Sequence, residues 1–417
     1  MPLRLDPEPT AASVDDHKVP AGIDGLTRAL IWLIAALLIL LPILTNEHKS
    51  KDSRLTDFLV FYGAAQIAAH SASDLYDPKV QTEVYQRIFP LPGGPSAHGY
   101  FSYPPFVALL YAPMASLPFW TAYRVNQAIS AVLYLLALML LLRRFLRHDR
   151  QLATVMAPFA LAYFPFIYNT WVTGQLSVLG FAAIAVALSE VKLGNLFCSG
   201  LALSICAYKP SLLILLLPML LFSRQFRILL GFATGALALA VTAGLVYGWH
   251  IWMAYDHFLR YSFGDMEHLR PLPQYSDLTA FFSLLFGSGS GPRIAMLCTL
   301  AVLPFLVMTW RRYQVRPDLV WACTLTWTLI LGPYVPIYDT VLLIASIIVT
   351  ASSHSVRSSR LLPAGLLIIF ACSWISEETA LFLHLQLLTV VIAAFGTLQL
   401  WACFQSTQEP KVSAVES

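Results

Sequence analysis

The chain has 417 residues, of which 58% are hydrophobic and only 12% are charged, and its formal net charge is +3. Soluble proteins carry roughly a quarter charged residues, so this composition argues against a soluble fold. The nearly balanced charge also argues against a nucleic-acid-binding protein, which needs a basic patch. The apolar share leaves room for about 12 membrane spans of roughly 20 residues each.

The apolar runs predict an all-α polytopic membrane protein, a bundle of about 12 transmembrane helices. The predicted spans are 27–45, 120–142, 152–168, 176–189, 193–207, 209–222, 226–247, 293–309, 318–333, 339–352, 361–375 and 382–402. The first run is interpreted as a retained span because no small-residue cleavage site follows it. This predicts a transmembrane domain at 27–403 between a disordered cytoplasmic tail (1–26) and a second cytoplasmic tail (404–417).

The basic residues orient the chain, because cytoplasmic loops of membrane proteins are enriched in Lys and Arg. The clusters are Arg143, Arg144, Arg147 and Arg150; Arg224 and Arg227; Arg311, Arg312 and Arg316; and Arg357 and Arg360. All of them fall on one face if the apolar segment 104–117 is re-entrant or interfacial. Two large outer loops with interfacial helices are then expected, at 46–119 and 248–292. The breaks 169–175, 208–209, 332–338 and 376–379 fall on the same outer face.

The first outer loop contains an acid beside an aromatic stretch. Asp57 precedes Phe58, and partial desolvation there would raise the pKa of its carboxyl and make it a better base. The alternative role for Asp57 is the N-cap of a helix over 58–69. Further along, the tandem prolines Pro104 and Pro105 hold Tyr103 extended, either as a substrate contact or as an anchor in the aromatic belt.

Three later breaks carry polar side chains. Gln175 follows Gly174 and offers a donor and an acceptor, or belongs to a simple capped turn. Lys209 could pair with a phosphate as a point charge, or its side chain could extend to the membrane interface. Asp339 is an acid at a span boundary, which makes it a candidate functional residue, with helix capping as the alternative.

The second outer loop is rich in titratable residues. At helical spacing Asp256, His257 and Arg260 lie near each other, and Asp256 with Arg260 could equally form a structural salt bridge. His250, His257 and His268 match no standard zinc spacing, so no metal site is expected. There is also no phosphate-binding glycine loop and no Rossmann fingerprint, and we expect no cofactor. The six cysteines form no disulfide framework.

Several short motifs together resemble a known family. They are Asp57-Phe58 with Tyr62, Leu75-Tyr76-Asp77, Tyr103-Pro104-Pro105 with Pro113 and Pro118, Gly174-Gln175, Lys209-Pro210, and Pro333-Tyr334 with Tyr338-Asp339. In this order they resemble the polytopic glycosyltransferases of the GT-C superfamily, and most closely glycosyltransferase family 87. The resemblance covers about residues 27 to 400.

The resemblance implies a transferase that uses a polyprenyl-phosphate sugar, typically mannose, and an acceptor at the outer face. It places the general base on Asp57 and implies inversion at the sugar centre. The characterised mannosyltransferases of the family carry a His-containing stretch late in the chain, where this sequence has Tyr338-Asp339. A bacterial cytoplasmic membrane is the expected location.

Our leading hypothesis is therefore a glycosyltransferase acting on a lipid-linked sugar and a lipid or glycan acceptor, within membrane lipids and without nucleic acid. Lys209 and Arg260 are predicted to contact the phosphate, and the sugar or acceptor contacts are expected from Tyr62, Tyr103, Gln175, His257 and Asp339. A transporter or flippase of lipid-linked glycans is the alternative, although it calls for charged residues at mid-span and few are present. A non-catalytic scaffold would leave the converging polar residues unexplained.

Overall fold

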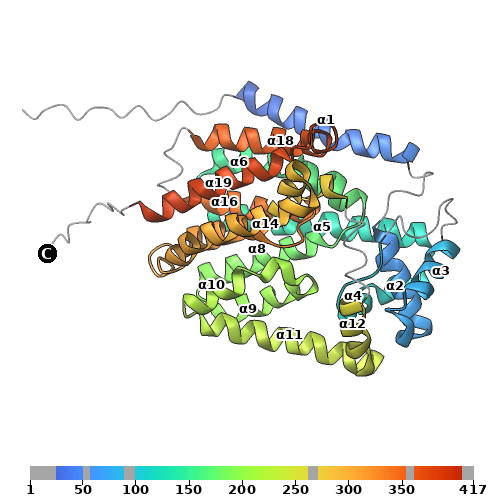
Figure 1. The fold of residues 1–417 in the computed structure, drawn as a ribbon. Helices are drawn as coiled ribbons and strands as arrows, with labels where there is room; N and C mark the ends of the chain where they lie inside the picture. The colour runs from blue at the N-terminus through green and yellow to red at the C-terminus, as the bar shows by residue number, and fades with distance from the viewer. Residues whose placement is uncertain (1–24, 50–56, 89–98, 262–270, 354–360, 406–417) are drawn as a thin grey trace, which may run out of the picture.

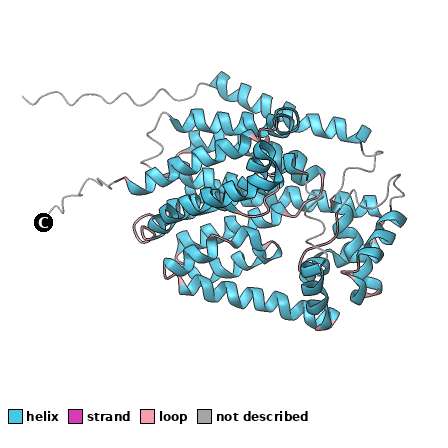
Figure 2. Ribbon diagram, in the orientation of Figure 1, coloured by secondary structure: helices cyan, strands magenta, loops and turns pink. Residues whose placement is uncertain are grey.

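The computed structural model describes residues 25–49, 57–88, 99–261, 271–353 and 361–405. Within these residues the protein is helical and contains no strand, apart from one isolated β-bridge between Tyr275 and Pro336. Figure 2 shows the helices packed around one another without a sheet. The all-α prediction is thus confirmed for the described residues. Most of both predicted tails (1–24 and 406–417) and parts of both predicted outer loops lie outside them.

The N-terminal half contains both long and short helices (Figure 1). In chain order they are α1 (Gly25–Lys49), α2 (Phe58–His70), η1 (Ala72–Asp74), α3 (Pro78–Ile88), α4 (Pro105–Tyr111), η3 (Ala112–Ser116), α5 (Phe119–Phe145), α6 (Arg150–Leu161), α7 (Phe164–Phe166), the π-helix η4 (Ile167–Val172), α8 (Ser177–Leu193), α9 (Leu196–Ser204) and η5 (Ile205–Tyr208).

The C-terminal half is again a mixture of long and short helices. They are η6 (Pro210–Leu213), α10 (Leu216–Phe222), α11 (Phe226–Tyr247), α12 (His250–Tyr261), η8 (Leu272–Gln274), α14 (Leu278–Trp310), α15 (Pro317–Leu331), η9 (Ile337–Leu342), α16 (Leu343–Ser352), α18 (Leu361–Leu383) and α19 (Leu387–Phe404). Proline begins several of these helices, since its missing N–H costs nothing in a first turn.

Among the described residues, five helices are long and apolar enough to cross a bilayer: α5, α11, α14, α18 and α19. A sixth span is possible if α6 and the following α7–η4 segment, bent by 44°, count as one. The protein is therefore a multi-pass membrane protein, but the predicted count of about 12 spans is not confirmed. Several other predicted spans coincide with shorter apolar helices, for example α9 with η5 and η6 with α10.

The structure corrects two predicted boundaries. The polar residues 376–379 do not interrupt a span, because α18 continues through them to Leu383 and the chain turns at His384 (φ 55°). Similarly, α14 begins at Leu278, well before the predicted start at 293, and is kinked at Gly287 (φ 81°). By contrast, the segment 104–117 forms only the short helices α4 and η3, too short to cross a bilayer.

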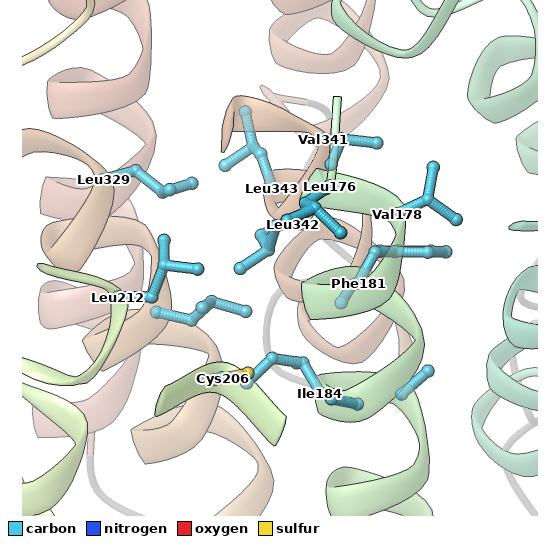
Figure 3. Close-up of a cluster of buried hydrophobic side chains, with 14 of the residues drawn as sticks. Leu176, Val178, Phe181, Ile184, Cys206, Leu212, Leu329, Val341, Leu342 and Leu343 are labelled. Carbon is cyan, nitrogen blue, oxygen red and sulfur yellow. The ribbon is translucent and has the colours of Figure 1, made fainter. Parts of the chain in front are cut away.

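The core lies around α8, which packs against α5 and α9. Figure 3 shows α8 side chains facing residues of η5, η6, α15, η9 and α16. The labelled residues are Leu176, Val178, Phe181, Ile184, Cys206, Leu212, Leu329, Val341, Leu342 and Leu343. Because lipid tails are as apolar as leucine, such packing stabilises the fold through close contact rather than through exclusion of water.

Helix α8 also links two chemically different ends of the molecule. At its N-terminus, Ser177 Oγ donates a hydrogen bond to Asp339 Oδ1 over 2.9 Å. Near its C-terminus, Lys192 pairs with Asp318 of α15 and lies 5.8 Å from the centroid of the Phe145 ring at the end of α5. With 17 residues at 1.5 Å per residue, these ends are about 25 Å apart.

Candidate active site

Asp57 stands immediately before α2, in the N-cap position, but its side chain does not cap the helix. The first helical N–H, from Phe58, donates to the carbonyl of Thr173 at 2.9 Å. The Asp57 carboxylate accepts a hydrogen bond from the side-chain amide of Gln175. The sequence offered two roles for Asp57, a general base and a helix N-cap. The side chain does not cap the helix, and its carboxylate points toward Gln175.

The surroundings of Asp57 favour its protonated form. Burial raises the pKa of the Asp57 carboxyl above its ordinary value, while the hydrogen bond from Gln175 and the positive charge of Lys209 lower it in part. A carboxylate with a raised pKa binds a proton more strongly, so it is a better general base once it is ionised.

Gln175 is held in place by the turn that precedes it. Gly174 adopts φ +79°, and a Cβ on this residue would lie 2.7 Å from Cβ of Phe58. Only glycine combines that conformation with this close approach. Gln175 is 6% exposed, and its Oε1 has no hydrogen-bond partner among the described residues. One end of the amide therefore holds the Asp57 carboxylate, and the other is a buried acceptor.

Lys209 and Asp339 form an ion pair in the protein interior. Lys209 lies in the break between η5 and η6, where Pro210 begins a new turn, and Asp339 lies in η9. Asp339 is fully buried and also accepts the hydrogen bond from Ser177. The ammonium group lies 4.7 Å from the ring centroid of Tyr338 and 5.5 Å from that of Tyr334, in the range of cation–π attraction.

Tyrosine side chains join the two polar pairs. Tyr103 lies within electrostatic range of Asp57 and Asp339, and its ring stacks on that of Tyr208 with the ring centroids 6.4 Å apart. Its backbone carbonyl accepts a hydrogen bond of 2.7 Å from the Tyr76 hydroxyl, which fixes the extended segment before the tandem prolines.

The structure thus brings together five of the residues expected from the sequence: Asp57, Tyr103, Gln175, Lys209 and Asp339. We call these five the polar cluster. Sequence analysis did not select Ser177, Tyr208, Tyr334 or Tyr338 as site residues. Tyr208 precedes Lys209, and Ser177 follows Gln175 by two positions. A serine or tyrosine beside an apolar run does not by itself indicate a functional site.

Three other expected residues have different surroundings. The Tyr62 hydroxyl donates to the carbonyl of Leu117 at 2.7 Å, which ties α2 to η3. Arg260 of α12 is 69% exposed and pairs with Asp256, the i,i+4 salt bridge foreseen as the alternative. His257 is exposed on the same helix. The substrate contacts expected from these three residues stay predictions, and the structure does not place the residues in the polar cluster.

The described residues contain no group of three His, Cys, Asp or Glu side chains that could hold a metal ion. His268, the third histidine considered for zinc, lies outside the described residues together with Asp265, Glu267 and Arg270.

The arrangement combines a buried carboxylate, a lysine paired with an aspartate and aromatic rings within an apolar helical bundle. A carboxylate in such surroundings can deprotonate a hydroxyl beside a bound anion. Residues 101–334, more than half of the chain, match the family model of glycosyltransferase family 87. The chain belongs to glycosyltransferase family 87. No curated protein and no solved structure matches it.

Family membership makes this protein a membrane glycosyltransferase, with a sugar donor and an acceptor as its substrates. The matched segment includes Tyr103, Gln175 and Lys209, together with His257 and Arg260. Asp57 and Asp339, the two acids of the polar cluster, lie outside it.

Proposed function

We propose that this family 87 enzyme transfers a sugar, with mannose as our proposed sugar, from a polyprenyl-phosphate donor to a hydroxyl group of a lipid or glycan acceptor. The single observation that carries the proposal is the Asp57 carboxylate, held by Gln175 within electrostatic range of Lys209. A base beside a buried positive charge suits attack of a hydroxyl on a sugar that leaves as a phosphate.

In the proposed reaction, Asp57 takes the proton of the acceptor hydroxyl as its oxygen forms a bond to the anomeric carbon of the donor. The bond from this carbon to the phosphate oxygen breaks, and the electron pair leaves with the polyprenyl phosphate. Direct attack from the opposite face inverts the anomeric centre. Phosphate is a good leaving group, so no acid is needed if a cation offsets the developing charge.

Lys209 is our proposed contact for that phosphate. It is held between Asp339 and the rings of Tyr334 and Tyr338, so its ammonium group is fixed before the donor arrives. We propose that Gln175, Tyr103 and Asp339 contact or orient the sugar and the acceptor. The exposed His257 and Arg260 of α12, with Tyr62 of α2, are proposed as contacts further from the reacting atoms.

The positions of the charges support a reaction at the outer face of the membrane, which we propose to be a bacterial cytoplasmic membrane. The polar cluster lies at the start of α8, whereas the end of α8 meets the ends of α5 and α15, where Arg143, Arg144 and Arg316 are found. Since basic residues mark the cytoplasmic side, we infer that the cluster faces the other side. A lipid-linked donor fits that location, which lacks nucleotide-activated sugars.

The proposal is tested with purified protein in proteoliposomes that contain a radiolabelled polyprenyl-phosphate mannose and an extract of membrane glycolipids. We expect label to move to an acceptor, and Asp57→Asn to lower the rate by about a hundredfold or more, the usual contribution of a general base. Asp77→Asn is the matched control, because Asp77 is an exposed acid of the same loop region that caps the backbone of Lys79 at 2.8 Å.

Full activity of Asp57→Asn would remove the proposed base. Movement of the labelled lipid across the bilayer without transfer of the sugar would instead support the flippase alternative. Transfer from a different polyprenyl-phosphate sugar would keep the mechanism and change only the identity of the sugar.

A further inference from the structure

The loop between α15 and η9, residues 332–336, is bound to a segment from another part of the chain. This segment is 275–277, between η8 and α14, and we call it the clamp segment. Besides the β-bridge described above, the N–H of Ser276 donates to the carbonyl of Val335 over 2.9 Å, and the Ser276 hydroxyl donates to the same carbonyl over 3.2 Å. The loop is therefore held at its backbone.

Asp277 completes this attachment from the protein interior. One of its carboxylate oxygens accepts a hydrogen bond of 3.1 Å from the N–H of Val335. The other oxygen caps α14 by accepting a hydrogen bond of 2.9 Å from the N–H of Ala280. Asp277 and Val335 are both fully buried. Because a buried N–H that loses its partner cannot turn to water instead, this side chain fixes the loop relative to the start of α14.

The clamp segment is itself anchored to the last helix of the chain. The hydroxyl of Thr389, on α19, donates to the carbonyl of Ser276 over 2.8 Å. Gln386, which precedes α19, donates through its side-chain amide to the carbonyl of Pro273 over 2.8 Å. Helices α14 and α19 pack on each other (Figure 1) and are two of the candidate membrane spans. The clamp segment is thus a fixed support for the loop.

Two tyrosine hydroxyls connect the clamp segment with the polar cluster. Tyr275 donates its hydroxyl to that of Tyr334 over 2.6 Å, and the two ring centroids are 4.9 Å apart. The centroid of the Tyr334 ring lies 5.5 Å from the ammonium nitrogen of Lys209. Cation–π attraction depends on where the ring stands relative to the cation. The position of Tyr334 therefore affects the position of the Lys209 ammonium group.

We infer that Tyr275 and Asp277 are positioning residues for the donor. They set the place of Tyr334 and, through its ring, the orientation of the Lys209 ammonium group that meets the donor phosphate. The inference rests on the proposed function in that it takes Lys209 as the phosphate contact. Neither positioning residue takes part in the proton transfer at Asp57, so both should affect binding of the donor and leave the acid–base step unchanged.

The test is binding of radiolabelled polyprenyl phosphate to the full chain in lipid nanodiscs. Tyr275→Phe keeps the ring and removes the hydroxyl, and we expect the dissociation constant to rise about threefold to tenfold, the usual worth of one hydrogen bond. Tyr134→Phe is the matched control, because Tyr134 is a fully buried tyrosine whose hydroxyl donates to the carbonyl of Ala160 over 2.7 Å. Its dissociation constant should equal that of the wild type.

The transfer assay separates positioning of the donor from a general loss of structure. In Tyr275→Phe the KM for the donor should rise by the same factor as the dissociation constant. The rate at saturating donor and the midpoint of the pH profile, which reports on Asp57, should stay at their wild-type values. A lower rate at saturating donor with an unchanged KM would overturn the inference.

A double variant shows whether Tyr275 acts through Tyr334. In the background of Tyr334→Phe the hydrogen bond between the two hydroxyls no longer exists, so the further change Tyr275→Phe should have no effect on binding. An equal effect in both backgrounds would overturn the inference, and so would wild-type affinity of the single variant Tyr275→Phe.

Fluorine NMR of the full chain labelled with 3-fluorotyrosine checks the positioning without any substrate. The Tyr334 resonance is the one that is missing in Tyr334→Phe, and it should shift in Tyr275→Phe. It should also shift in Asp277→Asn, because an amide keeps only one of the two acceptor oxygens. If Asp277→Asn fails to fold, Tyr275→Phe decides alone.

An unchanged Tyr334 resonance in Tyr275→Phe would overturn the inference. A shifted resonance in a protein that does not bind polyprenyl phosphate would have a different meaning. It would reject the donor of the proposed function, and with it the link to the donor, while the positioning of Tyr334 by the clamp segment would stand.

Discussion

Lys209 and Asp339, which are 130 positions apart in the chain, form an ion pair that is almost fully withdrawn from solvent. Their charges are mutually compensated within the protein, and the Ser177 hydroxyl satisfies a further acceptor position of the carboxylate. A donor phosphate that binds Lys209 therefore meets an ammonium group that is already oriented and partly neutralised. We regard the pair as a fixed element of the site whose cost in desolvation is offset only while both partners are present.

Removal of one partner should destabilise the protein strongly. Lys209→Met leaves a buried carboxylate without its counter-charge, and we expect a loss of about 3–5 kcal/mol in the free energy of unfolding. The double variant Lys209→Met with Asp339→Leu should recover most of that loss and still fail to transfer sugar. Unfolding in mixed micelles with increasing SDS, combined with the transfer assay, measures both effects.

The pair of Lys192 and Asp318 is the control for this experiment, because its side chains are 46% and 25% exposed. Lys192→Met should cost about 1 kcal/mol or less, as is usual for exposed ion pairs. Equal losses at the two pairs would contradict the special role of the buried one.

Transfer should decline on the acid side of its pH profile as Asp57 becomes protonated. Burial raises the pKa of this carboxyl above its ordinary 3.8, so the acid limb should lie at a higher pH than for an exposed aspartate. In Gln175→Leu the carboxylate loses the hydrogen bond that lowers its pKa, and the limb should move to still higher pH. Rates at saturating donor, measured across the pH range, give the midpoint of the acid limb for the wild type and for Gln175→Leu. Identical midpoints would show that Gln175 does not affect the pKa of Asp57.

The same raised pKa has a consequence for stability. A carboxyl with a higher pKa in the folded than in the unfolded state contributes stability below its unfolded pKa, and this contribution is lost as the pH rises through the folded pKa. Asp57→Asn should therefore melt at a higher temperature than the wild type near neutral pH, and the difference should shrink toward about pH 4. A variant that is less stable than the wild type at neutral pH would show that the ionised carboxylate stabilises the fold.

The sequence predicted the helices well where apolar runs were long and uninterrupted. The span predicted at 226–247 is α11, with the same bounds. It failed where polar residues lie within a helix: the residues 376–379 were interpreted as a break, yet α18 continues through them. A short polar stretch in a helix costs little if its side chains find partners, as Ser376 does by accepting a hydrogen bond of 2.8 Å from the backbone N–H of Leu388, and periodicity cannot show those partners.

The members of the polar cluster could be proposed one by one, because each stands at a break between apolar runs. Their pairing could not be predicted, since Asp57 meets Gln175 across 118 positions and Lys209 meets Asp339 across 130. Such pairs depend on how the helices pack. The local pattern around Asp57 favoured a helix cap equally, and the choice is resolved only by the structure, in which the carboxylate makes no cap and accepts a hydrogen bond from Gln175.

Gly174 offers a test of how the turn positions Gln175. Gly174→Ala should both destabilise the protein and lower transfer, because the left-handed conformation costs about 1–2 kcal/mol for alanine and the added Cβ would meet Cβ of Phe58 at 2.7 Å. Relief of that contact moves Gln175 relative to Asp57, so the rate should fall by more than the loss of folded protein explains.

Gly194→Ala separates the two effects. Gly194 also has a positive φ (+81°), but nothing lies within 4 Å of a Cβ placed there. This variant should show the conformational cost alone, with a specific activity per folded molecule equal to that of the wild type. The difference in unfolding free energy between the two variants measures the cost of the contact with Phe58. Equal specific activities in the two variants would mean that the turn at Gly174 does not position the amide that holds the base.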